Sequence, residues 1–111
     1  MKTEKKKPLD TLHHIAICVD DIKKSVEWYT KTFSCLVEYQ DDTWAILEFG
    51  NVKLAMVVAE QHPNHFAIIR PDAESFGPLK EHRDKTRTVY IKDPSGNTVE
   101  IMDESSLPMY G

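Results

Sequence analysis

The sequence HHIAICVDD at residues 13–21 returns in altered form as NHFAIIRPD at residues 64–72. Four of the nine aligned positions are identical, and each copy is an apolar run with a histidine near its start and an aspartate at its end. A shorter repeat pairs FGN at residues 49–51 with SGN at residues 95–97, and each of these turns precedes another apolar run. Such internal repetition predicts a fold made from two copies of one supersecondary unit.

The elements of the first unit follow from the periodicity of its apolar residues. Residues 12–19 are rich in branched side chains and predict a strand, after which Asp20 or Asp21 can cap the start of a helix. One face of this helix is apolar: Ile22, Val26, Tyr29 and Phe33. Three further strands are predicted at residues 36–40, 43–49 and 52–58. The predicted order is β-α-β-β-β.

The second unit repeats this order with a weaker helix. A strand is predicted at residues 64–70, and a helix that begins at Asp72 breaks near Gly77 and Pro78. Two strands follow at residues 86–92 and 97–102, and the remaining strand is expected between residues 80 and 88 unless it has been lost. We therefore predict an α+β fold of paired β-α-β-β-β modules, at about residues 12–58 and 64–102. These modules would form a single domain over residues 1–111.

Composition and charge exclude several classes of function. The 111 residues are 41% hydrophobic and 29% charged, which suits one globular domain, and a net charge of −4 predicts binding neither to nucleic acid nor to a membrane. The Lys-rich start, residues 2–7, runs into Pro8 and Asp10 rather than an apolar segment, so we expect a solvated tail. The other end, residues 103–111, is expected to be a loose end or a dimer contact. Cys18 and Cys35 form no CxxC motif, which favours a reducing, cytoplasmic location.

Strand parity predicts a metal site. His14 and Ala16 share one strand face, and His65 and Ala67 occupy the equivalent positions of the second copy, so the histidines point away from the faces that pack under the helices. If a pseudo-twofold axis relates the units, the two histidines converge near it. Glu100 is the one charged residue in the last apolar run, where a carboxylate is costly unless it is paired or bound to a cation. Any one of these residues alone would be an ordinary strand residue. Together they are candidate ligands for one divalent ion: Fe, Mn, Ni, Co or Zn.

The candidate ligands, together with the sequence DPSGNTVE at residues 93–100, resemble the glyoxalase, bleomycin-resistance and extradiol-dioxygenase group, the vicinal oxygen chelate superfamily. The resemblance covers residues 12–102. It implies that the strands of the paired modules curve into a cup around the metal ion and that a small-molecule substrate binds there. Members are commonly dimers, so the resemblance also implies a homodimer.

The resemblance bears on the type of reaction as well. Lactoylglutathione lyases and acyl-CoA epimerases carry a fourth ligand whose place falls here on Ala55, or on Leu54 if the turn repeat is followed, so their chemistry is not favoured. His82 and Tyr90 match a histidine and a tyrosine that contact substrate in extradiol dioxygenases, and both are expected in the catalytic site. The acid–base histidine of those enzymes, expected within residues 48–55, is absent.

We therefore expect a divalent-metal-dependent enzyme that acts on a small oxygen-rich substrate at a three-ligand, dioxygenase-like site. Tyr90 also matches a substrate-facing tyrosine of the fosfomycin-resistance transferases, although Ala16 replaces a threonine of that group. The alternatives are a metal-dependent lyase or transferase of the glyoxalase or fosfomycin-resistance type, a non-catalytic drug- or metabolite-binding protein, and a structural module with a vestigial site.

Four residues outside this set are assigned simpler roles. For Trp44, a place in the core is favoured over a place in a pocket wall. His13 and His62 are expected at the surface, and Arg87 at a solvated strand end.

Overall fold

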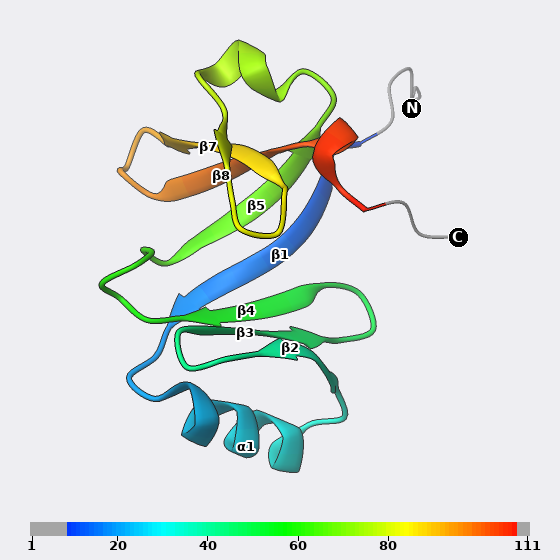
Figure 1. Ribbon diagram of the computed structural model, residues 1–111, viewed down its shortest axis with the longest axis vertical. Helices are drawn as coiled ribbons and strands as arrows, with labels where there is room; N and C mark the ends of the chain where they lie inside the picture. The colour runs from blue at the N-terminus through cyan, green and yellow to red at the C-terminus, as the bar shows by residue number, and fades with distance from the viewer. Residues whose placement is uncertain (1–8, 109–111) are drawn as a thin grey trace, which may run out of the picture.

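The chain forms a mixed eight-stranded sheet with the strand order β2-β3-β4-β1-β5-β8-β7-β6 (Figure 1). The computed structural model describes residues 9–108, so the Lys-rich tail and residues 109–111 lie outside the described residues. The first half contains β1 (Thr11–Cys18), α1 (Ile22–Thr32), β2 (Leu36–Gln40), β3 (Trp44–Glu48) and β4 (Lys53–Val57). The second contains β5 (His65–Arg70), η1 (Ala73–Phe76), β6 (Lys80–Glu81), β7 (Arg87–Lys92), β8 (Thr98–Asp103) and η2 (Glu104–Ser106).

The predicted α+β fold of paired modules is confirmed. Each half has its first strand paired in parallel with its last, β1 with β4 and β5 with β8, and the halves join where β1 and β5 run antiparallel. The strand that was not evident in the sequence is the two-residue β6, and the second helix is a single 3₁₀ turn, η1. Among residues 9–108, no helix is long and apolar enough to cross a lipid bilayer.

Helix α1 begins where the sequence predicts. The Asp21 Oδ1 atom accepts a hydrogen bond from the Lys24 backbone N–H at 2.9 Å, which satisfies a donor of the first turn. Ile22 and Val26 are buried against β3 and β4. Phe33, expected on the same buried face, is instead 49% exposed, because the backbone turns extended at this residue and carries its ring past the last helical turn.

Alternation along the strands gives the sheet two different faces. The face toward α1 and η1 carries two apolar clusters, one in each half of the chain. The first cluster is centred on Leu47 and Met56, and the second on Val99 and Ile101. Figure 1 shows α1 and η1 at opposite ends of the curved sheet. The other face is left to line a pocket.

The turn between β7 and β8 sets the pairing of these strands. The Asp93 Oδ1 atom accepts hydrogen bonds from the backbone N–H groups of Ser95 and Asn97, each at 2.8 Å. Gly96 has a φ of 88°, a left-handed conformation that favours glycine. This closed turn fixes the register that places Tyr90 directly beside Glu100.

Candidate metal centre

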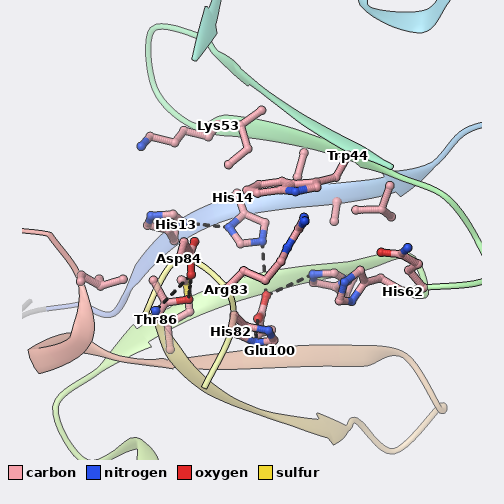
Figure 2. Close-up of a pocket in the computed structure, with 18 of the residues that line it drawn as sticks. His13, His14, Trp44, Lys53, His62, His82, Arg83, Asp84, Thr86 and Glu100 are labelled. Atoms are coloured by element: carbon pink, nitrogen blue, oxygen red, sulfur yellow. Dashed lines mark hydrogen bonds and ion pairs between the residues drawn. The ribbon is translucent and has the colours of Figure 1, made fainter. Parts of the chain in front are cut away.

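His14 on β1, His65 on β5 and Glu100 on β8 come together at the middle of the sheet. Their ligand atoms all lie within 4.8 Å of one another, and all three residues are buried. The Glu100 Oε1 atom lies 3.3 Å from His14 Nε2 and 3.2 Å from His65 Nε2 (Figure 2). The structure thus brings together the three residues that parity and repeat equivalence selected.

The pairing of β1 with β5 explains this convergence. His14 lies opposite Ala67, and His65 lies opposite Ala16, so the two histidines are related as a pseudo-twofold axis requires. Ala67 is also the neighbour of Glu100 across the β5–β8 pair. Both alanines are buried, and their short side chains leave the space between the three ligand atoms open. Larger residues at these two positions would fill the space that an ion needs.

Hydrogen bonds orient both imidazoles for binding a cation. The Pro63 carbonyl oxygen lies 2.8 Å from His65 Nδ1, and because a carbonyl can only accept, Nδ1 carries the hydrogen and Nε2 is the nitrogen left for a cation. His14 Nδ1 lies 2.7 Å from His13 Nδ1. Burial, and then the charge of His14, lowers the pKa of His13 to about 4, so at neutral pH His13 is uncharged and can accept the Nδ1–H of His14.

The electrostatics of Glu100 fit a cation between the three side chains. Burial alone would raise the pKa of Glu100, but its interactions with His14 and His65 outweigh burial and lower it, so the carboxylate is ionised. Burial likewise disfavours charge on His65, while Glu100 and the Pro63 carbonyl raise its pKa. Two imidazole lone pairs and a carboxylate oxygen facing one point require a proton or a metal ion between them. A donor set of two nitrogens and one oxygen suits a divalent transition metal.

Among residues 9–58, no fourth carboxylate joins this set. Ala55 on β4 lines the pocket beside Ala16, at the place where the resemblance puts the fourth ligand of the lyases and epimerases. Glu48 lies at the exposed end of β3 and is not part of the pocket lining. Within residues 9–108, the cluster that could hold an ion consists of His14, His65 and Glu100.

Three further polar residues lie near the Glu100 carboxylate. His82, just after β6, places Nε2 3.6 Å from Glu100 Oε2 and 2.7 Å from the Thr88 hydroxyl oxygen. The Tyr90 hydroxyl lies 3.0 Å from His62 Nδ1. Burial and the nearby charge of Glu100 raise the pKa of Tyr90, so the phenol keeps its proton at neutral pH. The structure thus places His82 and Tyr90 beside the cluster and adds His62.

Several pocket residues lie in other places than the sequence predicts. The surface assignment of His13 and His62 is wrong, because both are half-buried and line the pocket. Trp44 lines the pocket rather than the core, and Arg87 pairs with Asp103 at 2.9 Å instead of being free in solvent. For His13 the adjacent His14 was a usable signal. For His62 the sequence held none beyond its position three residues before His65.

The cluster lies in a pocket of about 410 Å³. Trp44 and Ile46 of β3 form an apolar part of its wall, and the loop between β6 and β7 supplies a polar part. Figure 2 shows His14, His82 and Glu100 in the pocket, with Trp44 along one side. Ligand atoms, an orienting shell and an adjoining space for a small molecule are therefore present together.

Comparison with known proteins identifies the class. The family model of the Glyoxalase/Bleomycin resistance protein/Dioxygenase superfamily matches residues 11–65, which run from the first residue of β1 to His65. The fold of solved superfamily structures extends over the second half as well. The chain belongs to this superfamily.

Three solved structures share the fold at low sequence identity. Methylmalonyl-CoA epimerase from Mycobacterium tuberculosis is 16% identical, with a TM-score of 0.66 over 83% of this chain and 86% of its own. A superfamily member from Vibrio splendidus 12B01 is 13% identical, with a TM-score of 0.66 over 85% and 98%. NAD-dependent benzaldehyde dehydrogenase from Legionella pneumophila is 15% identical, with a TM-score of 0.61 over 80% and 96%. No curated protein matches the sequence significantly. At these identities the similarity establishes the fold and not the reaction.

Proposed function

We propose that the protein is a divalent-metal-dependent enzyme that acts on a small oxygen-rich molecule, with His14, His65 and Glu100 as the metal ligands. The observation that carries the proposal is the approach of three buried ligand atoms to within 4.8 Å at the wall of a pocket. When bound, the ion would act as a Lewis acid on two neighbouring oxygens of the substrate. Three protein ligands leave coordination positions for those oxygens. The donor set of two nitrogens and one oxygen suits Fe, Mn, Ni, Co or Zn.

The chain's own residues would position the substrate around the ion. The Tyr90 hydroxyl lies 3.0 Å from His62 Nδ1, and when Nδ1 carries the hydrogen and donates it to the Tyr90 oxygen, the phenol's own hydrogen is free to be donated. Tyr90 would donate this hydrogen to a substrate oxygen and so stabilise charge that develops there. His82, between Glu100 and the Thr88 hydroxyl, would hold or transfer a proton at Nε2. Tyr90 and His82 are therefore the proposed catalytic residues.

Binding of catechol, which presents two adjacent oxygens, tests this function. Protein purified without chelator or a nickel column should carry about one divalent ion per chain. After anaerobic loading with Fe(II), catechol should produce a spectral change, and Tyr90→Phe should weaken its binding about three- to tenfold, the effect of one lost hydrogen bond. Tyr29→Phe, on α1 and outside the pocket lining, is the matched control.

The results also separate the candidate reactions. Oxygen uptake on adding catechol would support dioxygenase chemistry. Efficient turnover of the methylglyoxal–glutathione adduct would contradict the three-ligand assignment, since Ala55 offers no carboxylate to move a substrate proton. A protein that carries no metal, and that Mn, Fe, Ni and Zn fail to stabilise, would rule out the metal site.

A non-catalytic metabolite- or drug-binding protein is the second candidate. The exposure of Trp44 and Ile46 to the pocket supports it, because a flat apolar wall can bind a ligand without any metal. Ligand binding that survives removal of the metal and all three ligand side chains would favour this candidate over the enzyme.

We also propose a homodimer in the cytoplasm. Strand β2 is a sheet edge whose five residues are all exposed, and Leu36 on it is 68% exposed. Such an edge favours association with another chain. Sedimentation should show a dimer that Leu36→Lys dissociates, whereas Leu9→Lys, at a residue that is 92% exposed outside the strands, should not. A native monomer at high micromolar concentration would contradict the dimer.

A further inference from the structure

The opening of the pocket carries a guanidinium whose hydrogen-bond donors are not committed to the fold. Arg83 lies between β6 and β7, lines the pocket and has a side chain that is 73% exposed. Its Nη2 atom is 3.6 Å from Asp41 Oδ2, which is too long for a hydrogen bond. The Asp41 carboxylate already accepts hydrogen bonds from Tyr39, Thr43 and Trp44. Because Asp41 does not depend on Arg83, the guanidinium can turn to another oxyanion at little cost.

The backbone that carries Arg83 is nevertheless held in place. The His82 backbone N–H donates to the Thr86 carbonyl at 2.8 Å, and the Lys85 N–H donates to the His82 carbonyl at 2.9 Å. The Asp84 Oδ1 atom accepts from both the backbone N–H and the hydroxyl of Thr86, at 3.0 and 2.7 Å. Lys85 has a φ of 75°, a left-handed conformation that is unfavourable for a lysine. This tight hairpin keeps Arg83 over the pocket while leaving its side chain movable.

Several acidic residues of the lining have partners within the fold. Glu38 pairs with Lys53 at 3.0 Å, Glu81 approaches Lys85 at 3.8 Å, and the carboxylate of Asp84 is engaged by Thr86. Lys80, by contrast, lines the pocket without an ion-pair partner among the residues that the structure describes. Residues 80–86 carry three basic side chains, of Lys80, Arg83 and Lys85, and two acidic ones, of Glu81 and Asp84, so this hairpin bears a net charge of +1.

The same hairpin carries both Arg83 and a residue beside the candidate metal centre. His82, next to Arg83 in sequence, is the residue whose imidazole lies 3.6 Å from Glu100. Figure 2 shows Arg83 extending across the pocket on the side of His82, toward the wall that Trp44 forms. A small molecule bound at the centre would thus have Trp44 along one side and Arg83 near its far end.

We infer that the substrate is an oxyanion, with two neighbouring oxygens directed at the metal centre and a carboxylate, phosphonate or phosphate group bound by Arg83. Arg83 would exchange its loose contact with Asp41 for a bidentate contact with this group, for which a planar guanidinium is suited. Lys80 adds charge from the same side. The inference that two oxygens of the ligand bind the metal depends on the proposed function. The inference that its other end is anionic depends on Arg83.

Calorimetry with a matched pair of ligands tests the inference. The protein is loaded with Zn(II), which does not support redox turnover, and titrated with 3,4-dihydroxybenzoate and with its neutral analogue 3,4-dihydroxybenzamide. Native protein should bind the acid about tenfold more tightly than the amide, the effect of one charge-assisted hydrogen-bonded pair. Arg83→Gln should bring the ratio close to one, chiefly by weakening binding of the acid. Lys24→Gln, which removes the same charge from α1, should preserve the ratio.

Each other outcome has a distinct meaning. Equal binding of acid and amide by the native protein would overturn the inference and leave the proposed function standing. A preference for the acid that survives Arg83→Gln would overturn the role of Arg83. Uptake of zinc without binding of either ligand would also overturn the inference. Failure to take up zinc would contradict the proposed function, and the inference would fall with it.

Discussion

Replacement of Glu100 by glutamine is expected to abolish tight binding of a divalent ion while leaving the fold intact. Glutamine keeps the shape of the side chain, and its amide can donate to an imidazole Nε2 in place of the ion, so the buried site stays satisfied. The charge that attracts the cation is lost. His14→Ala and His65→Ala should also abolish binding, because each removes a nitrogen ligand whose Nε2 lies within 3.3 Å of the carboxylate.

The orienting histidine should have a smaller effect. His13→Ala removes the partner of His14 Nδ1, which lies 2.7 Å away, and leaves all three ligands in place. Loss of such an outer partner weakens metal binding by about 10- to 100-fold, so binding should persist at higher metal concentration. This graded series distinguishes a metal centre from a cluster of histidines that merely pack together.

Elemental analysis and thermal unfolding at a series of metal concentrations measure both effects. For native protein, an ion at 100 times its Kd should add about 2.7 kcal/mol to the free energy of unfolding. Glu48→Gln, at an exposed position of β3 outside the pocket, is the matched control and should retain that gain. Equal metal-dependent stabilisation of native protein and Glu100→Gln would contradict the site.

Replacement of Leu47 by alanine is expected to reduce the free energy of unfolding by about 2–5 kcal/mol. Leu47 is fully buried on β3, in the cluster that packs against Ile22 and Val26 of α1. A domain of this size is stable by about 5–15 kcal/mol, so the loss is a large fraction of the total. The cavity that this substitution leaves lies on the helix side of the sheet, away from the metal ligands. The number of metal ions bound should therefore not change.

Urea unfolding of metal-free protein checks this expectation. Leu9→Ala makes the same chemical change at a side chain that is 92% exposed, and it should cost no more than about 0.5 kcal/mol. Similar midpoints for the two variants would show that Leu47 does not lie in the core. Loss of metal binding in Leu47→Ala at temperatures where it remains folded would show that the two faces of the sheet are coupled.

The repeated HHIAICVDD and NHFAIIRPD segments predicted much of the architecture because strand alternation and helix capping are local properties of the chain. Both repeats became first strands of their halves, and Asp21 became the helix cap. Two elements of the second half are weakly marked in the sequence, the helix after Asp72 and the strand expected between residues 80 and 88. Gly77 and Pro78 stop the helix after one 3₁₀ turn, and their effect on helix length was visible in the sequence.

The pocket was less predictable because its remaining residues come from loops whose positions depend on contacts far away in sequence. His62, in the connection after β4, meets Tyr90 of β7 across 28 residues. Arg83 approaches Asp41 only because the β6–β7 hairpin folds back over the sheet. Trp44 and Ile46 lie on the same face of β3, and this face borders the pocket. The neighbouring sequence would look the same if this face packed against a second layer of core.

By itself, the sequence determined the two-unit architecture and singled out His14, His65 and Glu100, since a period of two along a strand and the equivalence of two repeats require no knowledge of distant contacts. Only the tertiary structure decided that these three side chains meet. Their meeting depends on the antiparallel register of β1 with β5, which sets each histidine opposite an alanine of the other strand. The tertiary structure also decided which charges face the pocket, because the folding of the β6–β7 hairpin over the sheet brings Arg83 and Lys80 to a site built by other strands.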